Sequence, residues 1–161
     1  MSGDPGLMYR TPAAFAATAA TILVAHAATQ VAYWRQPPSP TRGVNLWPTT
    51  VTNYQVRQVI KGAAGAWVQA IETGADSHHI ACPGLVAVFD ELPTASVGAD
   101  YVIAFNPPSD GSPPTITAWQ RFEVRSGKVY ADENGPLQVD GTELGAFVRQ
   151  MAGDRARPWP D

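Results

Sequence analysis

The sequence predicts a small, mainly β domain, and three observations support that fold class. Apolar and β-branched residues alternate with polar ones in several short runs, as they do in half-buried strands. The chain holds 15 prolines and 14 glycines in 161 residues, which is typical of frequent turns. No regular alternation of strands with helices is present, which argues against a doubly wound parallel sheet. We therefore expect a five-stranded Greek-key barrel with a short N-terminal helix and a C-terminal amphipathic helix.

One domain accounts for the chain, because 161 residues leave no room for two substantial ones. We expect this domain over residues 11–153, between a flexible N-terminus at 1–10 and a disordered tail at 154–161. The net charge of −3 argues against a nucleic-acid-binding protein. A single cysteine excludes an intrachain disulfide and any zinc site that needs two thiolates.

The N-terminal apolar run, residues 11–34, contains no Lys, Arg, Asp or Glu. Ala25-His26-Ala27 in this run has the form of a signal-peptidase site, but Arg10 is the only basic residue ahead of it. A membrane span is disfavoured, because His26 and Gln30 would lie in the bilayer without partners. We interpret the run as structured protein without a membrane span.

The first half of the chain predicts one helix and three strands. Thr11-Pro12 is a typical helix start, so we expect a helix over 12–19. The β-branched and aromatic residues that follow predict a strand at 21–34. In the next strand, 50–61, Tyr54 and Val56 share one face, and the pair Val59-Ile60 breaks the alternation as a bulge does. A glycine-containing turn then leads into a third strand at 66–73.

The second half begins with an irregular segment, residues 74–99, which we expect to form a long ordered connection across one end of the barrel. The apolar run Tyr101 to Phe105 predicts a buried strand at 100–106. A last strand and hairpin are expected at 115–131, turning at Ser126-Gly127. In that strand one face is apolar, formed by Ile116, Ala118, Phe122 and Val124.

A C-terminal helix is expected at 141–152. Asp140-Gly141-Thr142-Glu143 resembles a capping box, with Val139 and Leu144 as a hydrophobic staple. The apolar side chains of this helix recur at helical spacing and predict one buried face: Leu144, Phe147, Val148 and Met151.

Four motifs together resemble a known family. They are Ile22-Leu23-Val24-Ala25-His26-Ala27, Val56-Arg57-Gln58-Val59-Ile60-Lys61-Gly62, Gly98-Ala99-Asp100-Tyr101-Val102-Ile103-Ala104-Phe105, and the hairpin from Phe122 to Val129. In this order they are similar to OB-fold domains related to the tissue inhibitors of metalloproteinases, over residues 12–150. The resemblance implies an OB-like barrel and, because bacterial relatives often occur in exported proteins, an extracytoplasmic or secreted location. The animal inhibitors bind zinc through an N-terminal cysteine, which this chain lacks, so the resemblance implies no inhibitory activity.

One cluster of residues is a candidate for metal binding. His78, His79 and Cys82 are the one cluster of good metal ligands, but adjacent histidines on an extended chain point to opposite sides. The alternative, which we favour, is two solvated histidines and a small buried cysteine. No serine lies in a nucleophile elbow, and no phosphate loop or dinucleotide motif is present, so we expect neither an enzyme nor a cofactor.

The five tryptophans are the remaining candidates. Trp47, Trp67 and Trp119 are expected on outward positions and are candidates for an interface, because exposed tryptophan is enriched there. Packing beneath the proline-rich loops is an equal alternative. The sequence therefore favours a non-enzymatic binding or assembly module whose partner is a protein. The alternative is a metal- or haem-associated accessory protein that uses the His78, His79 and Cys82 loop, and the oligomeric state is left open.

Overall fold

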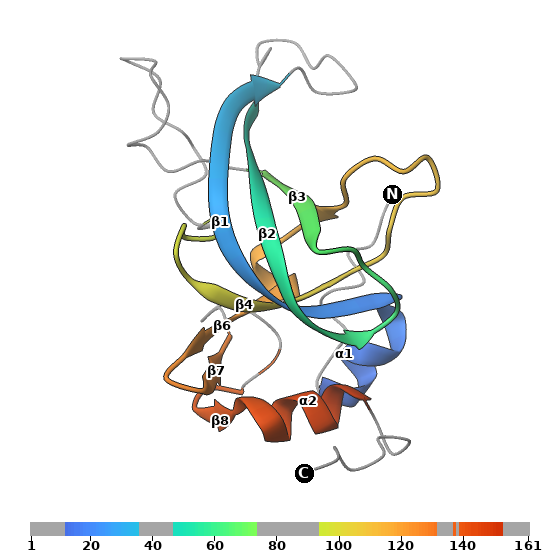
Figure 1. Cartoon of the computed structure of the whole chain (residues 1–161), viewed down its shortest axis with the longest axis vertical. Helices are drawn as coiled ribbons and strands as arrows, with labels where there is room; N and C mark the ends of the chain where they lie inside the picture. Colours follow the sequence, from blue (N-terminus) through green and yellow to red (C-terminus); the bar gives the residue numbers. More distant parts are fainter. Residues whose placement is uncertain (1–11, 36–46, 74–93, 132–136, 138, 153–161) are drawn as a thin grey trace.

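The computed structural model describes residues 12–35, 47–73, 94–131, 137 and 139–152. Strands dominate these residues, which confirms the mainly β class (Figure 1). The elements in chain order are α1 (Pro12–Thr18), β1 (Thr21–Arg35), β2 (Trp47–Lys61), β3 (Trp67–Thr73), β4 (Asp100–Phe105), β5 (Thr115–Ile116), the 3-10 helix η2 (Ala118–Gln120), β6 (Arg121–Arg125), β7 (Lys128–Tyr130), β8 (Thr142–Glu143) and α2 (Leu144–Ala152).

All the described strands belong to one eight-stranded sheet with the order β5-β3-β2-β1-β4-β6-β7-β8. Neighbouring strands are antiparallel, except for the parallel pair β3 and β5. The four strands expected between residues 21 and 106 are present as β1 to β4, although β2 begins earlier, at Trp47. The hairpin expected within 115–131 is present as β6 and β7, but the single strand expected ahead of its turn is wrong, because η2 divides it into β5 and β6.

The predicted bulge at Val59-Ile60 is confirmed. Ile22 pairs with Lys61 and Leu23 with Val59, so Ile60 has no opposite residue. Two more register shifts follow along the β1–β2 ladder. Bulges bend a strand and increase its twist, and both strands curve strongly along their length in Figure 1.

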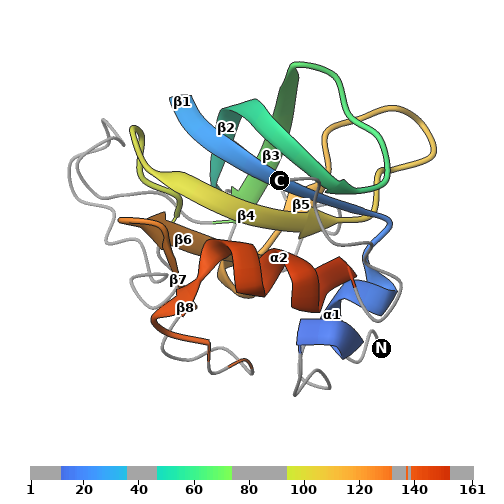
Figure 2. The same ribbon diagram turned by 60° about the horizontal axis from the view of Figure 1, so that its bottom comes forward.

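The sheet has an apolar core on each face. Ile22 and Val24 of β1 pack with α1 and α2, which both lie beneath the sheet in Figure 2. Leu23 and Ala25 point to the opposite face and pack with Tyr54. Because side chains of a strand alternate between faces, a 15-residue strand can serve both cores. This explains why the run from 21 onward is apolar at consecutive positions.

The C-terminal helix buries the expected face: Phe147, Val148 and Met151 are buried, and Leu144 packs against the same core. The expected capping box is wrong, because the helix begins at Leu144 and Thr142–Glu143 pairs with β7 as strand β8. Asp140 has another role, since its Oδ1 accepts the backbone N–H of Ala131 at 2.9 Å. Strand pairing across the chain has therefore replaced the local cap.

The turn at Ser126-Gly127 is confirmed as a tight hairpin, with both residues in the left-handed region at φ 51° and 74°. Two consecutive residues with positive φ are typical of the turn that matches strand twist.

Gly62 offers a sharp test of the turn after β2. Its φ is +77°, and an added Cβ would lie 2.4 Å from the carbonyl oxygen of Ala20. We expect Gly62→Ala to lower the free energy of unfolding by about 2 kcal/mol or more, measured by urea denaturation. Gly65→Ala is the matched control, because that position has nothing within 4 Å and no positive φ. If both substitutions lowered the free energy of unfolding equally, the positive φ of Gly62 and its close approach to Ala20 would not be what requires glycine there.

Candidate functional site

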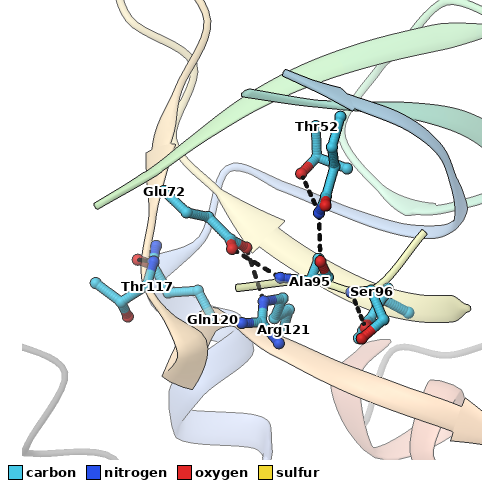
Figure 3. Close-up of polar contacts among 9 residues, drawn as sticks. Thr52, Glu72, Ala95, Ser96, Thr117, Gln120 and Arg121 are labelled. Carbon is cyan, nitrogen blue, oxygen red and sulfur yellow. Dashed lines mark hydrogen bonds and ion pairs between the residues drawn. The ribbon is translucent and has the colours of Figure 1, made fainter. Parts of the chain in front are cut away.

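A buried ion pair joins two distant parts of the sheet. Glu72 of β3 and Arg121 of β6 meet with Oε1 and Nε 2.7 Å apart, and their side chains are 4% and 9% exposed (Figure 3). The second carboxylate oxygen of Glu72 accepts the backbone N–H of Ala95 at 2.9 Å. The Arg121 guanidinium also lies over the Tyr101 ring, 5.4 Å from its centre. Each charge is thus compensated by a hydrogen-bonded partner, as a buried charge requires.

Residues 94–99 are held in place by the same polar network. The Gln30 amide donates to Thr52 Oγ1 at 3.0 Å and also to the carbonyl of Ala95. Tyr101 Oη accepts the N–H of Ser96 at 2.7 Å. Two backbone hydrogen bonds then join Ala27 to residues 98 and 99. The end of the expected 74–99 connection is therefore ordered, and the rest of it lies outside the described residues.

Tyr54 lies in this interior, and Thr52 is a polar side chain beside its hydroxyl. The side chain is fully buried and meets the Tyr101 ring edge to face, with 6.3 Å between ring centres. Its Oη has no hydrogen bond of normal geometry within the described structure. Burial, reinforced by the nearby Glu72 carboxylate, raises the pKa of Tyr54 far above its ordinary value. The phenol stays protonated at neutral pH and is no candidate for a general base.

The buried hydroxyl makes Tyr54→Phe a useful test. We expect the substitution to leave stability at neutral pH unchanged or slightly higher, because no hydrogen bond of normal geometry is lost and the desolvation cost of the hydroxyl disappears. In the wild type the folded pKa lies above the unfolded value of 10.0, so Tyr54 reduces stability as the pH rises past that value. Urea denaturation at about pH 8 and about pH 11 should show a smaller alkaline loss for the variant. A large loss already at neutral pH would show that the hydroxyl has a partner.

A second candidate lies on the opposite side of β1, β2 and β3, which we call the outer face. It faces away from Tyr54 and Ala70, and its residues lie in cross-strand rows. One row is polar: Gln69 Nε2 donates to Asn53 Oδ1 at 2.8 Å, and Asn53 Nδ2 donates to Thr29 Oγ1 at 2.9 Å.

The next row of the outer face is apolar. Val51 pairs with Val31 on one side and with Ile71 on the other. Val31 is 61% exposed, whereas Val51 and Ile71 are half-buried. Tyr33, 39% exposed, lies two residues beyond Val31 on the same strand. Such a row of apolar side chains on an exposed sheet is unusual unless something covers it.

The lower border of the outer face carries an aromatic residue and a close contact between a histidine and an aspartate. Trp67 of β3 is 58% exposed and pairs with Gln55, which itself pairs with His26. His26 Nδ1 lies 2.7 Å from Asp100 Oδ1, and both side chains are partly exposed. Trp67, His26 and Asp100 therefore belong to one row that runs across four strands.

The predicted site residues have different outcomes. Trp67 is exposed on a strand, as expected for an interface residue. The outward position expected for Trp119 is wrong: it lies in η2, half-buried, with Nε1 inaccessible and without a hydrogen-bond partner. The cause is local, because Gln120 Oε1 accepts the N–H of Thr117 at 2.9 Å and closes the 3-10 turn (Figure 3). Trp47 begins β2, but its side chain lies outside the described structure, as do His78, His79 and Cys82 entirely.

Sequence reasoning missed both the Glu72–Arg121 pair and the apolar row. Glu72 and the buried Ala70 are two residues apart on β3 and so lie on the same face of the strand. This spacing is the sequence signal that could have predicted that Glu72 points inward. Val31 and Tyr33 belong to a strand in which apolar residues occupy both faces. Periodicity alone therefore does not show which apolar residues of this strand face solvent.

No protein-family model matches the chain, and no curated protein is significantly similar to it. Among the described residues, no helix has the length and apolar character needed to cross a bilayer. The same residues contain no group of three or more His, Cys, Asp or Glu side chains arranged to hold a metal ion.

Proposed function

We propose that this protein is a non-enzymatic binding or assembly module, and that it contacts another protein through the outer face of β1–β3. The observation that carries the proposal is the cross-strand row of Val31, Val51 and Ile71, exposed at the Val31 end. Trp67 borders the same face and is largely exposed. Apolar and aromatic side chains gathered on one rigid surface are typical of protein interfaces.

The charge of the outer face favours a protein over a nucleic acid. The row of Thr29, Asn53 and Gln69 contains only amides and a hydroxyl, and the row of Val31, Val51 and Ile71 is apolar. A nucleic-acid surface needs Lys or Arg to neutralise phosphates, and the net charge of the chain is −3. The polar row Thr29, Asn53 and Gln69 can supply hydrogen bonds to a partner backbone.

The scaffold that we propose for this face is an OB-like five-stranded Greek-key barrel. Residues 115–125 support it, because β5 pairs with β3 and β6, a few residues later, pairs with β4. One segment thereby connects the two sides of the sheet, and the Glu72–Arg121 ion pair spans the same junction. On this proposal β1 to β4 and the segment 115–125 form the barrel, with α1 and α2 beneath it.

The extracytoplasmic or secreted location is part of the proposal, and it rests on the resemblance to OB-fold relatives of the metalloproteinase inhibitors. The proposal assigns no cofactor. It also does not use the loop of His78, His79 and Cys82, for which no observation in the described structure argues.

Site-specific photo-crosslinking in the source cells tests the proposed face. A benzoylphenylalanine residue is placed at Trp67 or at Val31, and a third variant carries it at Gln150, an exposed residue of α2, as the control. We expect the first two variants to form an adduct with the same protein, identified by mass spectrometry, and the control to form none. Equal adducts at all three positions, or no adduct at Trp67 and Val31, would refute the proposal.

A further inference from the structure

The strands that pair with β1 change along its length. β4 pairs with β1 only from Thr21 to His26, and backbone hydrogen bonds from residues 98 and 99 extend the contact to Ala27. From Thr29 to Arg35 the partner is β2 alone, on the other side. Within the described part of the chain, no strand pairs with this edge of residues 29–35. Figure 1 shows β1 and β2 extending together beyond β4.

Within residues 29–34, this edge lacks the features that usually keep sheet edges apart. Natural edges are protected by lysine, proline, bulges or very short strands. Residues 29–34 read Thr-Gln-Val-Ala-Tyr-Trp, with no charged residue, proline or glycine. Alternate backbone N–H and C=O groups of such a strand point outward and remain available for pairing.

The side chains beside the edge favour a strand as the occupant. Val31 is the most exposed large apolar residue of the described structure, and it ends the row of Val31, Val51 and Ile71 at this edge. A strand added beside β1 would continue that row and cover Val31 on its open side. A partner that contacted only the outer face would leave the outward N–H and C=O groups of residues 29–35 unpaired.

We infer that the occupant is β1 of a second copy of this chain, paired antiparallel about a two-fold axis at Val31. This inference rests on the proposed function. It identifies the partner that contacts the outer face at its β1 border. The edge is self-complementary: Val31 meets Val31 of the other copy, and Tyr33 lies opposite Thr29. Because residues 29–34 carry no charge, no like charges meet along these six residues, even though each chain has a net charge of −3.

Sedimentation analysis of the purified full chain over a range of concentrations tests this inference. We expect the wild type to form a dimer that dissociates on dilution. Val31→Lys should raise the dissociation constant about tenfold or more, because two lysines would face each other across the axis. Val59→Lys is the matched control, since Val59 is a 39% exposed strand residue on β2, paired with Leu23 near the other end of the ladder; it should leave the dimer unchanged.

Hydrogen exchange on the wild type gives a readout that needs no variant. The outward amides of residues 29–35 should become protected as the protein concentration rises. A monomer at every concentration would overturn the inference, whether these amides are open or already protected by another part of the same chain. A dimer that persists in Val31→Lys would overturn it too. A monomer that still forms the specific Trp67 adduct would leave the proposed function standing and refute only the second copy as the partner.

Discussion

Replacing Glu72 with alanine is expected to lower the free energy of unfolding by about 3–5 kcal/mol, because the buried Arg121 side chain would lose the carboxylate that lies 2.7 Å from its Nε. The substitution also removes the acceptor for the N–H of Ala95 and so releases residues 94–99 from β3. Urea denaturation followed by circular dichroism measures the loss. If the variant does not fold at all, the same comparison is made in a stabilising osmolyte, which strengthens burial without changing the contacts.

Two controls separate the burial of the charge from the loss of an ion pair. Glu123→Ala removes a pair in which Arg125 Nε and Glu123 Oε1 are 3.5 Å apart and both side chains are well exposed, so we expect a loss below about 1 kcal/mol. The double variant Glu72→Leu, Arg121→Met should recover part of the stability lost in Glu72→Ala, since it removes both charges of this buried pair. A small effect of Glu72→Ala would show that the Glu72–Arg121 pair itself contributes little to stability.

Phe122→Ala is expected to cost about 3–5 kcal/mol through the cavity that it leaves. Phe122 is almost fully buried and joins the two helices to the sheet. Its ring centre lies 5.4 Å from that of Phe15 in α1 and 5.1 Å from that of Phe147 in α2. The loss is measured by urea denaturation, with near-ultraviolet circular dichroism to report the packing of the aromatic side chains.

Val124→Ala, two residues further along β6, is the control for Phe122→Ala. Val124 packs against the same core but is only partly buried, so its truncation should cost clearly less. If the two substitutions had equal effects, the three-ring contact would not be the connection between the helices and the sheet.

Local sequence determined the strands and their faces. The positions of β1 to β4 and the bulge at Ile60 follow from β-branched runs and from breaks in alternation, which act over a few residues. The buried face of α2 follows from helical spacing. Ser126-Gly127 determined its own hairpin, because a two-residue turn with positive φ needs nothing from the rest of the chain.

Only the tertiary structure decided which segments meet. Thr142–Glu143 had a helix-capping pattern but became strand β8, because β7 offered it backbone hydrogen bonds. Trp119 was expected to face solvent, but the Thr117–Gln120 turn broke the alternation. Glu72 and Arg121 are 49 residues apart, and no local pattern shows that they pair. Contacts of this range depend on the path of the whole chain, so the sequence alone predicts the elements, whereas the tertiary structure decides which charge is buried and which strands pair with β1.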